Sequence, residues 1–165
     1  MRLANKIAIV TGAASGFGEG IARRFAAEGA KVVVSDLNAL RGERVVRDIT
    51  VGGGKACFVV GDVSIDADVA AMIRCALDTF GDLDIVVNNA GTTHRNQPML
   101  DVSEEEFDRI YRVNVKSLLL TARHAVPHFR KRKSGVFITI ASTGGVRPRP
   151  GLTWYNGRKG AGSGT

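Results

Sequence analysis

The sequence predicts a single α/β domain in which helices cover both faces of a doubly wound parallel sheet. Short runs rich in β-branched residues alternate with longer stretches of helical period, which is the pattern of successive βαβ units. The short runs are also apolar at consecutive positions, as strands covered on both faces must be. Residues 1–165 are therefore expected to form one domain of three layers, α/β/α.

Five strands are predicted, and all five are expected to be covered by helices on both faces. They are KIAIVT (residues 6–11), KVVVSD (31–36), ACFVVG (56–61), LDIVVN (83–88) and GVFITIA (135–141).

Helices are predicted between these strands. Three of them show apolar stripes at helical spacing, namely Phe17, Ile21 and Phe25, then Val69, Met72, Ile73, Ala76 and Leu77, then Phe107, Ile110, Tyr111, Asn114 and Leu118. Ser103 and Glu106 have the spacing of a capping box at the start of the third. A weaker helix is expected between Asp36 and Gly52, where a run of three glycines ends it.

Composition narrows the class of protein. With 44% hydrophobic and 24% charged residues, the chain is expected to be globular. Its apolar runs are too short for a membrane span or a signal peptide. We therefore expect a cytoplasmic protein. The net charge of +7 does not predict a nucleic-acid partner, because Lys and Arg are scattered except in RKRK (130–133), which follows a helical stretch.

Cysteine and histidine spacing predicts no metal site. Cys57 and Cys75 fall in a predicted strand and a predicted helix, without a partner at metal-ligand spacing, and are expected to be reduced core residues. His124 and His128 are four residues apart, but no third ligand accompanies them.

The stretch TGAASGFG (residues 11–18) joins the first strand to the first helix. Its glycines suit a plain turn, but they also let a phosphate approach the backbone at a helix N-terminus. Asp36 decides between these readings, since it ends the second strand and a carboxylate there accepts hydrogen bonds from a ribose. The sequence therefore predicts a dinucleotide site.

The glycine spacing, T-G-x-x-x-G-x-G, resembles that of the short-chain dehydrogenase/reductase family. Further motifs agree with this resemblance in chain order: Asp62-Val63, Asn88-Asn89-Ala90-Gly91, Asn114, Ser142, and Tyr155 with Lys159 as Y-x-x-x-K. The resemblance implies a Rossmann-like sheet of strand order 3-2-1-4-5. Family members continue beyond Y-x-x-x-K with a substrate-binding segment, so we expect this chain to be a truncated member.

The resemblance also implies a set of cofactor-binding residues. They are Gly12, Ser15, Gly16, Phe17, Gly18, Asp36, Leu37, Asp62, Val63, Asn89, Ala90, Gly91, Tyr155 and Lys159. Asp36 favours NAD over NADP because its carboxylate repels a 2′-phosphate, although Arg41 and Arg44 follow closely.

Four residues are assigned catalytic roles by the same resemblance. Tyr155 is expected to be the general acid/base, and Lys159, one helical turn on, to stabilise its phenolate and bind the nicotinamide ribose. Ser142 is expected to hold the substrate oxygen, and Asn114 to bind a water that connects Lys159 to solvent. A satisfied structural amide is the alternative for Asn114.

The function expected is reversible hydride transfer between NAD(H) and a secondary alcohol or ketone, in a homo-oligomer that is a dimer or a tetramer. The alternative is a dinucleotide-binding fragment without catalysis. The sequence does not identify the substrate.

Overall fold

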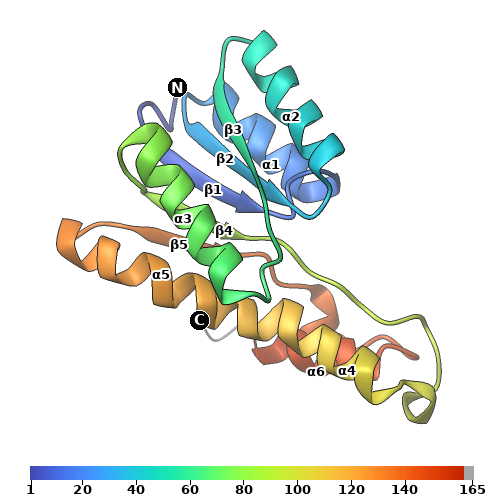
Figure 1. The fold of residues 1–165 in the computed structure, drawn as a ribbon. Helices are drawn as coiled ribbons and strands as arrows, with labels where there is room; N and C mark the ends of the chain where they lie inside the picture. Colours follow the sequence, from blue (N-terminus) through green and yellow to red (C-terminus); the bar gives the residue numbers. More distant parts are fainter. Residues whose placement is uncertain (162–165) are drawn as a thin grey trace.

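The computed structural model describes the backbone of residues 1–161 and the side chains of residues 1–157. Its centre is one parallel sheet of five strands in the order β3-β2-β1-β4-β5 (Figure 1), which confirms the predicted order. The strands are β1 (Ile7–Thr11), β2 (Lys31–Asp36), β3 (Lys55–Val60), β4 (Ile85–Asn88) and β5 (Val136–Thr139). The predicted bounds are correct for β2 and differ by one or two residues at the ends of the others.

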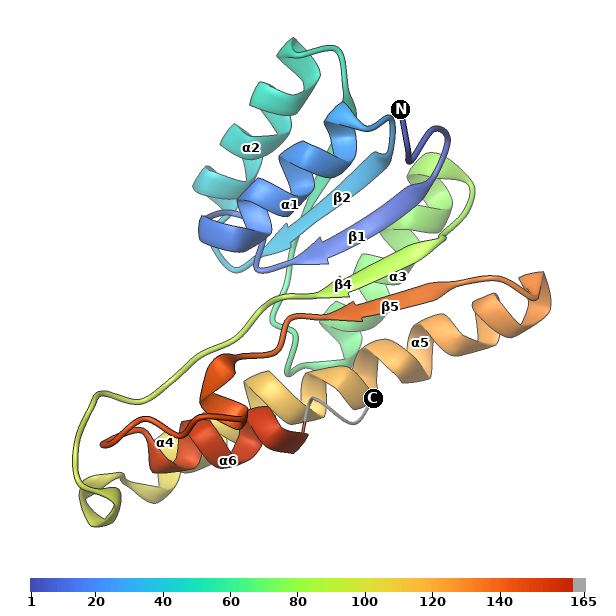
Figure 2. The ribbon, with the colours of Figure 1, turned by 180° about the vertical axis from the view of Figure 1, so that it is seen from behind.

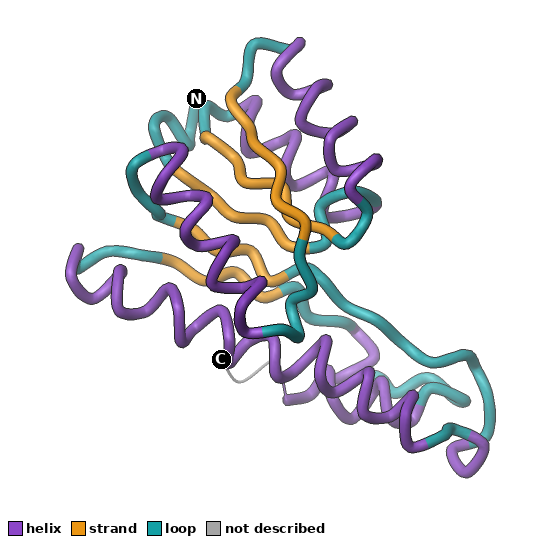
Figure 3. Tube along the Cα trace, viewed as in Figure 1, coloured by secondary structure: helices purple, strands orange, loops and turns teal. Residues whose placement is uncertain are grey.

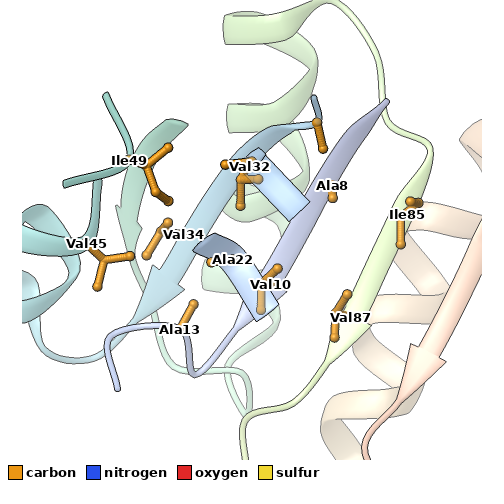
Figure 4. Close-up of a cluster of buried hydrophobic side chains, with 12 residues drawn as sticks. Ala8, Val10, Ala13, Ala22, Val32, Val34, Val45, Ile49, Ile85 and Val87 are labelled. Atoms are coloured by element: carbon orange, nitrogen blue, oxygen red, sulfur yellow. The ribbon is translucent and has the colours of Figure 1, made fainter. Parts of the chain in front are cut away.

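Helices cover both faces of the sheet, as expected. The covering helices are α1 (Gly16–Ala27), α2 (Ala39–Val51), α3 (Asp66–Phe80) and α5 (Ser117–Arg132), whereas α4 (Glu104–Tyr111) and α6 (Thr153–Ala161) lie beyond one edge of the sheet. The core between the sheet and α1 and α2 contains Val10, Val34 and Val45 (Figure 4), whereas Ile9, Ile73 and Phe129 belong to the core that α3 and α5 form on the opposite face.

Helices were expected to cover both faces of all five strands, and this coverage is incomplete for the two outermost strands. Val60 in β3 is 58% exposed and Val136 in β5 is 52% exposed, while β1 is buried throughout. The cause is position in the sheet, because the helices leave parts of the outermost strands uncovered. Apolar runs in the sequence do not distinguish a central strand from such an edge.

The stripe predicted for α1 is also wrong at its first member. Phe17 is 83% exposed, and the buried face consists of Gly18, Ala22 and Ala26. Small side chains on this face allow the helix backbone to lie close to the sheet. Ile21 and Phe25 flank the buried face and are only partly covered.

Two helices begin with a side-chain cap. Asn38 Oδ1 accepts a hydrogen bond from the Arg41 N–H at the start of α2, and Ser103 Oγ accepts from the Glu106 N–H at the start of α4. The Glu106 carboxylate accepts a hydrogen bond from Gln97 Nε2, so this side chain serves the preceding loop. Each cap satisfies a backbone donor that the first turn leaves without an acceptor.

The loops that follow the strands gather at one edge of the sheet. Figure 2 shows the strand arrows pointing toward α4 and α6, and Figure 3 shows the loops from the carboxyl ends of the strands meeting at that edge. α4 continues into α5 through a π-helical turn, η2 (Arg112–Lys116). A short 3₁₀ turn, η3 (Thr143–Gly145), follows β5, and α6 packs against η3, η2 and α4.

A buried carboxylate holds the opposite end of the sheet together. Asp84 is 7% exposed; its Oδ2 accepts a hydrogen bond from the Ile7 N–H (2.9 Å), and its Oδ1 accepts from Lys6 Nζ and Arg132 Nη1 (both 3.2 Å). Burial alone raises the pKa of this carboxyl, but the hydrogen bonds from Ile7, Lys6 and Arg132 outweigh it and leave the pKa below its usual value.

Asp84→Asn is expected to lower the free energy of unfolding by about 2–3 kcal/mol at neutral pH, because the charged hydrogen bonds are lost. Since the folded pKa is depressed, this stability is present above the unfolded pKa of about 3.9 and is lost as pH falls through the folded pKa. Urea denaturation across a pH series measures the difference between the two proteins, which should shrink below about pH 4. The control is Asp78→Asn at an exposed carboxylate; an equal loss in both variants would contradict the assignment.

Candidate functional site

The glycine loop between β1 and α1 is shaped by two glycines that need special backbone geometry or space. Gly12 has a φ of +63°, a left-handed backbone conformation that residues with a Cβ rarely adopt. Gly18 packs directly against the Gly12 carbonyl and the Asn89 amide, so a Cβ at position 18 would overlap both. The first turn of α1 is therefore held tightly against the end of β1.

A hydrogen-bond network joins this loop to the turn after β4. The Thr11 hydroxyl donates to the Val87 carbonyl (3.2 Å) and accepts from the Asn89 and Ala90 N–H groups (both 3.1 Å). Asn89 Nδ2 donates to the carbonyls of Thr11 (2.9 Å) and Gly12 (3.1 Å). Thr11 is 2% exposed, so these bonds are buried and fix the two turns relative to each other.

The N-terminus of α1 differs from those of α2 and α4. Its N-cap residue, Ser15, has extended backbone geometry and makes no side-chain capping bond. Backbone N–H groups of the first turn consequently lack a side-chain acceptor, at the positive end of the helix dipole. Such a terminus favours an anion.

Asp36, at the end of β2, faces the same loop. Its Oδ2 accepts a hydrogen bond from the Ala14 N–H and its Oδ1 accepts from the Asn38 N–H, both at 3.0 Å. Each carboxylate oxygen has a further acceptor position, which can take a hydroxyl donor. The side chain thus positions the loop and still offers negative charge to a ligand.

These elements surround a cavity of about 450 Å³. Many of the predicted cofactor-binding residues line it: Gly12, Ser15, Asp36, Leu37, Asp62, Val63, Asn89, Ala90 and Gly91. Gly16, Phe17 and Gly18 belong to the adjoining first turn of α1, with Gly18 buried behind the loop and Phe17 directed to solvent.

Ser142 and Tyr155 come together at the carboxyl end of β5. A Cβ built on Gly144 would lie 3.4 Å from both Ser142 Oγ and Tyr155 Cε1, so the two side chains flank the same glycine. Ser142 Oγ accepts a hydrogen bond from the Gly144 N–H (3.2 Å), and this bond leaves the hydroxyl proton available for donation. Lys159 lies in α6, but its side chain is outside the described residues.

Trp154 attaches α6 to α4 and to the loop before it. The indole N–H donates to the Met99 carbonyl (3.1 Å), and the ring packs edge-on against Phe107 with centroids 5.3 Å apart. The Gln97 N–H donates to the Gly151 carbonyl just before α6 (3.0 Å). These contacts set the position of the first turn of α6 and hence of Tyr155.

Asn114 lies in the π-helical turn and is almost fully buried. Its Oδ1 accepts a hydrogen bond from the Thr92 N–H, and its Nδ2 donates to the carbonyls of Thr92 and Ile110. The amide is thus satisfied by the protein itself and ties the loop after β4 to the helix. π-Helical turns of this kind often occur at functional sites.

Comparison with known proteins agrees with this arrangement. A family model described as short chain dehydrogenase matches residues 6–165. The chain belongs to the short-chain dehydrogenase family.

Relatives and solved structures of the short-chain dehydrogenase family resemble this chain along most of its length. The 4-formylbenzenesulfonate dehydrogenase TsaC1/TsaC2 of Comamonas testosteroni is 53% identical over 98% of the chain and 64% of the relative. The NADH complex of a 3-ketoacyl-(acyl-carrier-protein) reductase from Brucella melitensis has a TM-score of 0.91 and 48% identity, over 96% of this chain and 66% of that one.

A third similarity is to 7α-hydroxysteroid dehydrogenase in complex with NADH and 7-oxo glycochenodeoxycholic acid. Its TM-score is 0.94 at 37% identity, over 99% of this chain and 63% of that one. The chain therefore spans less than two thirds of the length of these relatives. Their names describe oxidoreductases, the class to which the short-chain dehydrogenase family belongs.

Four residues that line the cavity were missed by sequence reasoning. They are Gly61, Thr92, Arg109 and Val113. Arg109 Nη1 donates to Thr92 Oγ1 (2.6 Å) and its Nη2 donates to the Thr93 carbonyl (3.2 Å), so the guanidinium fixes the far wall. Arg109 and Val113 have the i, i+4 spacing of one helix face, and this was the available signal.

The described residues contain neither a metal site nor a membrane span. No group of three or more His, Cys, Asp or Glu side chains lies together in this part of the chain. His124 Nε2 lies 3.0 Å from Asp66 Oδ1, and His128 Nε2 lies 2.8 Å from Asp82 Oδ1. Among the helices described, none has the length and apolar character to cross a membrane.

Gly18→Ala is expected to destabilise the fold by about 1–3 kcal/mol, because the new methyl group overlaps backbone atoms of Gly12. Gly20→Ala in the same helix is the matched control, since no atom outside the local helix backbone lies within 4 Å of a Cβ there. This control should be neutral or stabilising by up to about 1 kcal/mol. Chemical denaturation measures both variants, and equal stability of the two would contradict the tight packing at Gly18.

Proposed function

We propose that this protein is an NAD-dependent oxidoreductase that transfers hydride reversibly between NAD(H) and a secondary alcohol or ketone. The observation that supports this most is the uncapped N-terminus of α1 at the edge of a cavity whose other walls include Asp36 and the Asn89-Ala90-Gly91 turn. The diphosphate of a dinucleotide would bind at the N-terminus of α1, and its ribose would donate hydrogen bonds to Asp36.

The residues present fit a dinucleotide. Close approach of the backbone to a diphosphate requires the absence of side chains, and Gly16 provides it, since no atom outside the neighbouring residues and the local helix backbone lies within 4 Å of a Cβ at this position. Gly12 and Gly18 pack against the turn after β4 and against each other, and so hold the loop in the shape that would receive the diphosphate. Asp36 would accept from the adenosine ribose, Leu37, Asp62 and Val63 would flank the adenine, and Asn89, Ala90 and Gly91 would form the wall behind the cofactor. NADH is bound in the two solved structures named above, which supports the nicotinamide class.

NAD is favoured over NADP by the charges around the ribose position. The Asp36 carboxylate would repel a 2′-phosphate. Arg44 is paired with Glu19, at 2.9 Å between Nη2 and Oε2, so its charge is partly neutralised within the protein. Arg41 lies in the first turn of the same helix, α2, and is the nearby cation most able to oppose this preference.

Tyr155 is assigned the general acid/base role at the substrate oxygen. Ser142 would donate its hydroxyl proton to the same oxygen, since its lone pair already accepts from Gly144. When bound, the nicotinamide would give or take the hydride. Lys159, one turn beyond Tyr155 in α6, is assigned to stabilise the phenolate and to bind the nicotinamide ribose.

Asn114 is assigned a positioning role. Its side chain holds the Thr92 backbone, and with it the segment that follows Gly91 in the cavity wall. The relay of a proton from Lys159 through a water held by Asn114 remains part of the proposal. Assembly into a dimer or tetramer and a cytoplasmic location also remain predictions.

The substrate is proposed only at the level of its class. The relatives named above act on chemically different molecules, an aromatic aldehyde, an acyl-carrier-protein conjugate and a steroid. Their substrates share an alcohol or carbonyl carbon that exchanges a hydride, and we propose a substrate of this class for the present protein.

Tyr155→Phe is expected to abolish turnover and to leave NADH affinity unchanged, because the variant loses only the proton-transferring hydroxyl. Turnover is measured by absorbance of NADH with a panel of alcohols and ketones, and binding by fluorescence titration with NADH and NADPH. In both proteins NADH should bind more tightly than NADPH.

Tyr111→Phe makes the same chemical change on α4 and is the control, which should retain turnover. Turnover by Tyr155→Phe would refute the acid/base assignment. Cofactor binding without turnover in the unaltered protein would support a non-catalytic dinucleotide-binding module, and indifference to both cofactors would refute the proposed function altogether.

A further inference from the structure

The two cysteines of the chain are brought together by the fold. Cys57 lies in the edge strand β3 and Cys75 lies in α3, and their Sγ atoms are 3.4 Å apart. They were expected to be reduced core residues; both are free thiols that pack at the border of the core, half-buried and next to each other. A disulfide has a sulfur–sulfur distance of about 2.05 Å, so a modest side-chain movement brings these atoms to bonding distance.

The surroundings of the pair keep Cys57 in its protonated thiol form. Burial, and after it the hydrogen bond with Cys75, raises the pKa of the Cys57 thiol to about 12. Cys57 therefore stays protonated at neutral pH and is a poor first nucleophile. Cys75 is half-buried, and its Sγ lies 3.9 Å from the hydroxyl of Thr79, an exposed residue of α3.

We propose that Cys57 and Cys75 are a redox-sensitive pair, which forms an intramolecular disulfide with a small disulfide oxidant and thereby fastens edge strand β3 to α3. In the first step the Cys75 thiolate attacks oxidised glutathione, which forms a mixed disulfide and releases one glutathione thiolate. The released glutathione thiolate then takes the proton of the Cys57 thiol, and the Cys57 thiolate attacks the Cys75 sulfur. This step breaks the mixed disulfide and releases the second glutathione as a thiolate, which is protonated by solvent. Two protein thiols are oxidised and one oxidised glutathione is reduced to two thiols.

The bond would close a loop that carries part of the cofactor cavity. Residues 57–75 include Gly61, Asp62 and Val63, which line the cavity. This connection is already ordered, because the Asp62 N–H donates to Asp68 Oδ2 and the Ser64 N–H donates to Asp62 Oδ1, both at 2.8 Å. Cross-linking is therefore expected to preserve the cavity and to act mainly by restricting the unfolded chain.

Intact mass and thiol alkylation test the bond directly. The reduced protein is incubated with oxidised glutathione, then denatured and alkylated with iodoacetamide. The expected product is a monomer lighter by two hydrogen atoms that takes up no alkyl group, with a cross-linked peptide joining Cys57 to Cys75. Two alkyl groups, a stable glutathione adduct or only disulfide-linked dimers would overturn the proposal.

Thermal unfolding of the same samples tests the fastening of β3. Oxidation should raise the melting temperature by about 5–10 °C, and dithiothreitol should reverse the rise. Cys57→Ser and Cys75→Ser are the controls, and each should retain one alkylatable or glutathionylated thiol with no such rise. A disulfide that leaves the melting temperature unchanged or lowers it would refute the stabilising role, whatever the outcome for cofactor binding or turnover.

Discussion

The buried hydrogen bonds between Thr11 and the turn after β4 are the constraint on which the candidate site depends. Thr11 and Asn89 together fix the carbonyls of Thr11 and Gly12, so the glycine loop has one position relative to the sheet. With the Gly12 carbonyl in place, only a residue without a Cβ fits at position 18. The start of α1 is consequently brought to the carboxyl edge of the sheet, where its N-cap residue, Ser15, lines the cavity.

The same edge collects the other parts of the site because every strand in the sheet is parallel. β2 delivers Asp36 beside the loop, β4 delivers the Asn89-Ala90-Gly91 turn, and β5 leads to Ser142. α6 is placed differently, since Trp154 and the loop after β4 attach it to α4. The cofactor cavity therefore rests on the sheet, whereas the Tyr155 site rests on contacts between loops and helices.

Much of this could be predicted from the sequence because it follows from local rules. The alternation of β-branched runs and helical stretches predicted the parallel sheet, and the glycine loop with Asp36 predicted residues that now line one cavity. The exposure of Phe17 could not be predicted from periodicity. α1 packs closely on the sheet through Gly18, Ala22 and Ala26, so its small residues are buried and the large Phe17 is not. The contacts of Arg109 with the loop after β4 and the meeting of Cys57 with Cys75 depend on segments that are distant in the sequence, so local patterns could not predict them.

The most direct measurement of the central claim is an amide NMR titration of ¹⁵N-labelled protein with NADH. If the diphosphate of the cofactor is received by the first turn of α1, the largest shifts should fall on the backbone amides of Ser15, Gly16, Phe17 and Gly18, with smaller ones around Asp36. Saturable shifts confined to another part of the chain, with these amides unmoved, would contradict the account.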